Sequence, residues 1–155
     1  MEIATDRLLK ATAILFLGIV LSGCSVGLPY HKAKPNLPAL AAGKSRVFVY
    51  RSFNVPELVH PRVVLIDGKI FGDILTGTTS YRDVASGHHI FSLAKRNRKL
   101  NVQLRPGEVT FLRITIHSDD KGGIDTIIKV VPRQTAEQDL QTINVIEAKF
   151  RNLVK

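Results

Sequence analysis

The 155-residue chain contains one cysteine, no tryptophan and only 6% aromatic residues. A single cysteine excludes both an intramolecular disulfide and a cysteine-based zinc cluster. The sequence also lacks the His-Glu-x-x-His and phosphate-binding glycine patterns, which mark common metalloproteases and nucleotide-binding enzymes. We therefore expect neither an enzyme nor a bound cofactor.

Acidic residues are scarce relative to basic ones, because 13 Asp and Glu stand against 22 Lys and Arg, for a net charge of +9. An excess of this size favours an anionic partner or surrounding and has no bearing on the fold. Hydrophobic residues make up 45% of the chain and charged residues 23%, which is typical of a packed globular protein. The length favours one domain.

Residues 1–23 are interpreted as a lipoprotein signal peptide. A short basic start is followed by an apolar run over residues 11–21, which is shorter than the roughly 20 residues of a membrane-spanning helix. The run ends in four residues that resemble a bacterial lipobox: Leu21, Ser22, Gly23 and Cys24.

Cys24 is the expected lipidation site. In proteins with a lipobox the peptide is cut before the cysteine, whose thiol carries the lipid, and Ser25 is a residue type that permits sorting to the outer membrane. We expect a protein that is anchored through this lipid and faces the periplasm, since two or more acyl chains give stable anchoring. An uncleaved membrane anchor with an incidental cysteine is the alternative.

Residues 24–45 are expected to form the lipidated cysteine and a flexible tether. The segment has little hydrophobic periodicity and holds three of the seven prolines. A coil of about 20 residues extends roughly 25 Å, so the tether would keep the domain close to its membrane.

Residues 46–131 predict an all-β fold, a small antiparallel β-sandwich of about seven or eight strands. The Asp67-Gly68 pair predicts a two-residue hairpin turn, and the polar segment 76–80 predicts a loop. Alternating and β-branched runs predict strands at residues 46–51, 62–67, 69–74, 81–84, 88–95, 100–104, 109–117 and 124–131.

Residues 132–155 predict a short helix and a basic tail. Thr135 and Gln138 resemble a capping box, so we expect the helix to begin there. Leu140 and Ile143 would form its apolar side.

These segments together resemble the bacterial lipoproteins that carry domain of unknown function 2846, and the wider PEGA-like group of transthyretin-like β-sandwiches. The resemblance covers about residues 46–131, with Ser86 where the family usually has proline. It implies an envelope location and a sandwich fold, and it carries over no catalytic or binding residues. It rests on a strand at residues 47–51, a hairpin at 64–72, the strand of Tyr81, the turn and histidine strand at 86–90, and residues 104–109 before a long strand.

Four cations cluster at an expected hairpin tip, and a fifth follows one strand-length later. They can contact anionic lipid headgroups, lipopolysaccharide phosphate or peptidoglycan carboxylate, at about 1 kcal/mol per charge. The alternative is a solvated tip that protects strand edges. The residues are Lys95, Arg96, Arg98, Lys99 and Arg105.

Metal and nucleic acid are not expected as ligands. His88 and His89 are neighbours on a predicted strand, so their side chains point to opposite faces. Asp119 and Asp120 offer too few spaced oxygen ligands for calcium. The lipobox directs the chain out of the cytoplasm, and no aromatic residues are interleaved with the cations to stack bases.

The sequence therefore predicts a membrane-anchored periplasmic lipoprotein that acts as a non-catalytic envelope binding or assembly module. Its partner would be an anionic envelope polymer or an envelope protein. The alternative is a structural or stress lipoprotein that contacts peptidoglycan or lipopolysaccharide through the basic hairpin tip.

Overall fold

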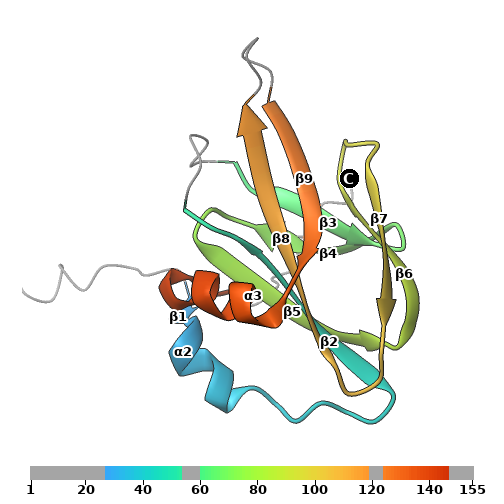
Figure 1. Ribbon diagram of the computed structural model, residues 1–155, viewed down its shortest axis with the longest axis vertical. Coiled ribbons are helices and arrows are strands. Elements are labelled where there is room, and N and C mark those ends of the chain that lie inside the picture. The colour runs from blue at the N-terminus through green and yellow to red at the C-terminus, as the bar shows by residue number, and fades with distance from the viewer. Residues whose placement is uncertain (1–26, 54–59, 119–123, 147–155) are drawn as a thin grey trace, which may run out of the picture.

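The computed structural model describes residues 27–53, 60–118 and 124–146 (Figure 1). Within these ranges, ten strands form a six-stranded and a four-stranded sheet. The two sheets face each other, and a short helix near the C-terminal end covers the outside of the larger one (Figure 1). The prediction of an all-β sandwich with a short C-terminal helix is confirmed.

The larger sheet has the strand order β1-β10-β5-β2-β8-β9. Its strands are β1 (Leu28–Pro29), β2 (Lys44–Arg51), β5 (Thr78–Ala85), β8 (Val109–Ser118), β9 (Ile124–Val131) and β10 (Asn144–Val145). Two pairs are parallel, β2 with β8 and β10 with β5. The sheet is therefore mixed and not wholly antiparallel, because the chain crosses to the other sheet between β5 and β8 and re-enters beside β2.

The smaller sheet is antiparallel throughout, with the order β4-β3-β6-β7. Its strands are β3 (Arg62–Ile66), β4 (Lys69–Ile74), β6 (Gly87–Leu93) and β7 (Lys99–Leu104). Asp67 and Gly68 join β3 to β4 with φ values of 50° and 78°. This is the positive-φ geometry that the Asp-Gly pair predicts.

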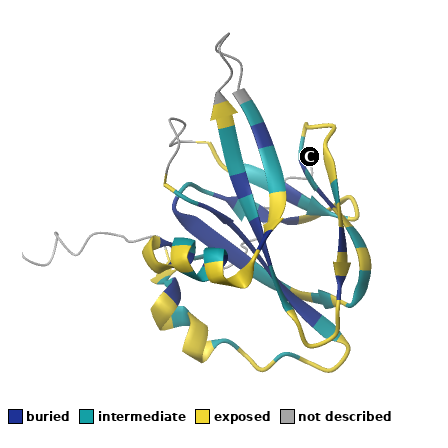
Figure 2. Ribbon diagram, in the orientation of Figure 1, coloured by how far each residue is buried: buried dark blue, intermediate teal, exposed yellow. Residues whose placement is uncertain are grey.

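Two hydrophobic cores lie on opposite faces of the larger sheet, so β2 is buried from Ser45 to Arg51 (Figure 2). The core between the sheets consists of Val47, Val49, Val64, Phe71, Ile74, Phe91, Leu93, Val102, Leu104, Leu112 and Ile114. The core under the helices consists of Tyr30, Phe48, Tyr50, Phe111, Val131, Ala136, Leu140 and Ile143.

The expectation of a flexible tether over residues 24–45 is wrong for residues 28–36. This part forms β1, the helical turn α2 (Tyr30–Ala33) and the 3-10 turn η1 (Lys34–Asn36). Tyr30 is 4% exposed, and its ring lies edge-on to Phe48 at 5.6 Å between centroids. Burial of this aromatic ring fixes the segment against the second core, and a proline count does not reveal that.

The polar segment 76–80 is not wholly a loop, because Thr78, Thr79 and Ser80 open strand β5. All three residues are buried, next to β2. Thr79 donates its hydroxyl to the Val49 carbonyl at 3.1 Å. A buried hydroxyl can thus pair with the backbone, which lets a polar run occupy the middle of a sheet.

The C-terminal helix α3 (Arg133–Asp139) begins two residues before the predicted Thr135, and the 3-10 turn η2 (Leu140–Thr142) follows it. Pro132 precedes α3, and its carbonyl accepts a hydrogen bond from the Ala136 amide at 3.0 Å. No side chain caps this end, so the predicted capping box is wrong. Proline suits a helix start because its fixed φ is already helical.

Helix α3 is fastened to the larger sheet by a polar cluster beside its apolar side. Tyr50 donates its hydroxyl to Asp139 at 2.6 Å, and Arg113 donates to the same carboxylate at 3.0 Å. Burial raises the pKa of Tyr50, and the hydrogen bond to Asp139 raises it further. Leu140 and Ile143 are buried as predicted.

Candidate functional site

The four clustered cations lie on the hairpin between β6 and β7. Lys95 has a left-handed backbone with φ of 62°, and the Arg96 amide donates to the Leu93 carbonyl at 3.1 Å. Every residue from 95 to 99 is exposed (Figure 2). We call Lys95, Arg96, Arg98 and Lys99 the basic tip.

One cation of the basic tip is paired. Arg98 lies 3.0 Å from the Asp125 carboxylate on β9, with side chains 69% and 45% exposed. An ion pair this exposed contributes only about 0–1 kcal/mol. Within the described part of the chain, Lys95, Arg96 and Lys99 form no ion pair. Three positive charges of the basic tip therefore have no ion-pair partner among the residues that the structure describes.

Arg105 is separate from the basic tip. It follows the last residue of β7, so it lies about 20 Å along the strand from Lys99. Its guanidinium is 3.7 Å from the Glu108 carboxylate. The structure thus unites four of the five predicted contact residues and leaves the fifth at the other end of the strand.

A pocket of about 280 Å³ lies between the basic tip and β9. β7 and β9 are edge strands of their sheets, so the sandwich opens between them. The lining combines cations, apolar side chains and one hydroxyl. It consists of Leu93, Arg96, Arg98, Lys99 and Leu100 on the hairpin side, and of Thr126, Ile127 and Ile128 on β9.

Thr126 is a buried polar residue in this lining. Its side chain is 2% exposed, and its hydroxyl has no hydrogen-bond partner among the described residues. An unsatisfied buried hydroxyl costs about 1–3 kcal/mol. The sequence gives no signal for it, because alternation predicts β9 but not which hairpin faces that strand.

The two adjacent histidines have different environments. His88 is exposed, whereas the His89 ring lies between Asp67 and the Ala85 carbonyl at 2.6 and 2.8 Å. The pKa of Asp67 is lowered, mainly by the hydrogen bond from the Ile90 amide and next by the hydrogen bond with His89. These contacts brace the turn between β3 and β4.

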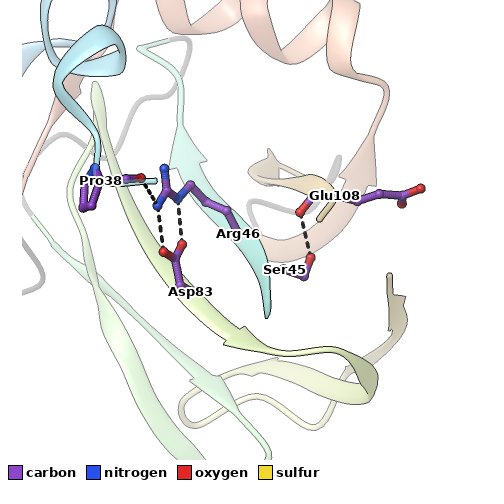
Figure 3. A network of polar contacts seen from close by, with 5 residues as sticks. All are labelled: Pro38, Ser45, Arg46, Asp83 and Glu108. Carbon is purple, nitrogen blue, oxygen red and sulfur yellow. Dashed lines mark hydrogen bonds and ion pairs between the residues drawn. The ribbon is translucent and has the colours of Figure 1, made fainter. Parts of the chain in front are cut away.

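Arg46 is a buried cation whose partners are all internal (Figure 3). It donates to both Asp83 carboxylate oxygens at 2.6 and 2.7 Å and to the Pro38 carbonyl at 2.7 Å. Ser45, beside it, donates to the Glu108 carbonyl at 2.9 Å. The hydrogen bond to Asp83 raises the pKa of Arg46. This network holds the segment before β2 on the sheet.

The lipobox residues Leu21, Ser22, Gly23 and Cys24 lie outside the described residues, as do Asp119 and Asp120. Among the residues that are described, no helix has the length and apolar character needed to cross a membrane.

Comparisons with known proteins add little to this description. No family model matches the chain, and no curated protein matches it significantly. Among solved structures, the N-terminal domain of AlgF from P. aeruginosa is 16% identical and aligns with a TM-score of 0.39, over 61% of this chain and 100% of that one. A likeness of this size carries no argument about fold or function.

Proposed function

We propose that the protein is a membrane-anchored lipoprotein of the bacterial envelope that acts as a non-catalytic binding or assembly module. The lipobox-like residues 21–24 support the anchor, and the resemblance to lipoproteins with domain of unknown function 2846 agrees with it. The observation that carries the binding role is the exposed basic tip, in which three cations have no ion-pair partner among the described residues.

The basic tip suits an anionic envelope surface. Each cation contributes about 1 kcal/mol near such a surface, so three cations strengthen binding roughly a hundredfold at low salt. Screening acts over about 8 Å at physiological ionic strength, so this contact weakens as salt rises. A structural or stress lipoprotein that binds peptidoglycan or lipopolysaccharide through the same tip is the second candidate, and it is favoured by the same exposure.

The lipid anchor is tested by changing Cys24 to Ser in the full chain. The expected result is loss of radiolabelled palmitate incorporation and release from the membrane fraction, since only a thiol carries the thioether-linked lipid. Ser22→Ala is the matched control, because it keeps a small residue beside the cleavage point. Labelling of the Cys24→Ser variant would show that the lipid is not on this residue.

The binding role is tested with the chain from residue 25 to 155, which retains every described element and both cores. The variant Lys95→Asn, Arg96→Ser, Lys99→Ser removes three charges of the basic tip and leaves the Arg98–Asp125 pair intact. We expect the original chain to co-sediment with purified sacculi or lipopolysaccharide vesicles at low salt, and the variant to lose at least tenfold in affinity.

The matched control is Lys32→Ser, Lys69→Ser, Arg133→Ser, which removes the same charge from three exposed positions away from the tip. This control should retain binding within about twofold. Equal losses in both variants would mean that net charge, and not the basic tip, makes the contact. Binding to the sacculi or vesicles that persists at high salt would mean that the contact is apolar and not ionic.

A further inference from the structure

We propose that the edge of the sandwich formed by β1, α2 and η1 lies against the lipid bilayer, so that the basic tip points away from the membrane that anchors the protein. We call this surface the anchor edge, and it consists of residues 28–36. The inference rests on the proposed function, because it takes Cys24 as the lipidated residue. It goes beyond that function by giving the anchored domain a lipid-contacting surface and an orientation.

The folded domain begins close to the lipidated residue. Gly27 approaches the Val145 carbonyl so closely that a side chain at residue 27 would clash with it. Strand β1 pairs with β10 directly afterwards, and the Tyr30 amide then donates to the Ile143 carbonyl at 2.9 Å. The chain is therefore held on the larger sheet from residue 27 onward.

The short link limits how far the anchor edge can lie from the membrane. Gly27 is three residues after Cys24, and an extended chain spans at most about 3.6 Å per residue, so their Cα atoms are at most about 11 Å apart. The acyl chains on Cys24 lie in the hydrocarbon, which holds that residue at headgroup level. Because the headgroup region of one leaflet is about 5–8 Å thick, Leu28 lies in the headgroups or just above them.

The side chains of the anchor edge suit a lipid surface. Leu28 is 58% exposed. Lys32 is exposed and forms no ion pair within the described part of the chain, whereas Lys34 pairs with Glu137 at 2.7 Å. Residues 24–43 contain two lysines and no acidic residue. A leucine at this depth can enter the apolar boundary, and a lysine beside an anionic headgroup strengthens the contact about fivefold.

The basic tip lies at the opposite edge of the domain. β1 and β9 are the two edges of the larger sheet, so five strand spacings, about 24 Å in all, separate them. The tip is joined to the β9 edge by the contact of Arg98 with Asp125 at 3.0 Å. Figure 1 shows β1 and α2 at the left of the molecule and the hairpin between β6 and β7 at the right. This orientation favours a polymer such as peptidoglycan over the lipids of the anchoring membrane as the partner of the basic tip.

The test uses the full lipidated chain in vesicles of phosphatidylethanolamine and phosphatidylglycerol that carry a nitroxide quencher on the headgroup. Because the lipid occupies the thiol of Cys24, an introduced cysteine is the only reactive thiol and can be labelled with bimane. His31→Cys labels the anchor edge and Asn97→Cys labels the hairpin of the basic tip. Both positions are exposed, and both variants keep every lysine and arginine. We expect at least threefold more quenching at residue 31 than at residue 97, and equal or reversed quenching would overturn the proposal.

A double variant tests the surface itself. Leu28→Ser, Lys32→Gln should lower the quenching of the label at residue 31 at least twofold, with palmitate incorporation unchanged. Lys129→Gln, Val130→Ser is the matched control, because it removes one exposed lysine and one aliphatic side chain that is 48% exposed from the β9 edge. This control should leave the quenching unchanged. If Leu28→Ser, Lys32→Gln also leaves it unchanged, the link alone sets the orientation and the anchor edge makes no lipid contact.

The orientation and the proposed function fail in different ways. Palmitate on Cys24→Ser would mean that both the anchor and the orientation are wrong. If Cys24 carries the lipid but the two labels are quenched equally, the orientation is wrong and the proposed function stands. If residue 31 is quenched as expected while Lys95→Asn, Arg96→Ser, Lys99→Ser still binds sacculi, the orientation stands and the polymer contact of the basic tip is wrong.

Discussion

Asp67 shows at the residue scale how one carboxylate fixes a turn. The Asp-Gly pair predicts the turn itself, because positive φ at both positions suits these residue types. The contacts of the carboxylate with the Ile90 amide at 2.9 Å and with His89 come from a strand 22 residues or more away. A local pattern cannot predict partners that only sheet pairing brings together.

The lowered pKa of Asp67 gives a pH dependence with a definite sign. Its folded-state pKa lies below the ordinary value of 3.8. The stabilising effect of the carboxylate is therefore complete above pH 3.8, and it is lost as the pH falls through the folded-state pKa. We expect Asp67→Asn to cost less than about 1 kcal/mol at pH 5, because the side chain is 46% exposed. This cost should shrink towards pH 2.5.

The measurement is urea unfolding of both proteins between pH 5 and 2.5. Asparagine also tolerates the left-handed backbone of this position, so the turn is retained. Asp73→Asn, on the neighbouring strand, is the control for removing one carboxylate from this sheet. If the free energies of unfolding of Asp67→Asn and the original chain differ by the same amount from pH 5 to pH 2.5, the lowered pKa of Asp67 is contradicted.

The N-terminal segment shows at the element scale where composition misleads. Prolines and missing periodicity predict a coil before β2, yet α2 and η1 dock on the second core. Tyr30 supplies the buried ring, and Glu137 on α3 accepts hydrogen bonds from Lys34 at 2.7 Å and from the Tyr30 hydroxyl at 3.4 Å. One aromatic residue, not a pattern, decides whether the segment folds.

Tyr30→Ala should release this segment and leave the sandwich folded. Removing a buried aromatic ring costs about 3–5 kcal/mol, and that loss falls on the contact between α2 and the core. We expect trypsin to cleave after the exposed Lys32 at least tenfold faster, with the near-ultraviolet spectrum of the sandwich largely kept.

Tyr30→Phe is the matched control for this variant. It keeps the ring and removes only the long hydrogen bond to Glu137, so cleavage after Lys32 should change by less than about twofold. Rapid cleavage in both variants would show that the hydroxyl, and not the packing of the ring, holds the segment.

At the scale of the whole molecule, the fold was more predictable than the site. Periodic and β-branched runs, with turn residues between them, predict β4 and β9 with their observed bounds. The order of strands within a sheet leaves no such periodic trace. The sequence therefore does not predict the parallel pairing of β2 with β8 or the approach of β9 to the basic tip.

The candidate site is likewise only partly predictable from the sequence. The cations of the basic tip are contiguous in sequence, so their clustering on one exposed hairpin is predictable from the chain alone. The pocket is not, because Thr126 and Ile128 are about 30 residues from the hairpin and resemble ordinary strand residues. Only the meeting of two sheet edges turns them into a lining.

The parallel pairing of β2 with β8 also has a kinetic consequence. Arg46 lies opposite Val109, so the centre of the larger sheet cannot form until a stretch of more than 60 residues has closed into a loop. Pairings of such long range slow folding, since the entropy of closure is lost before the contacts form. Strand β2 therefore pairs with only one of its two neighbours, β5, until β8 has been synthesised.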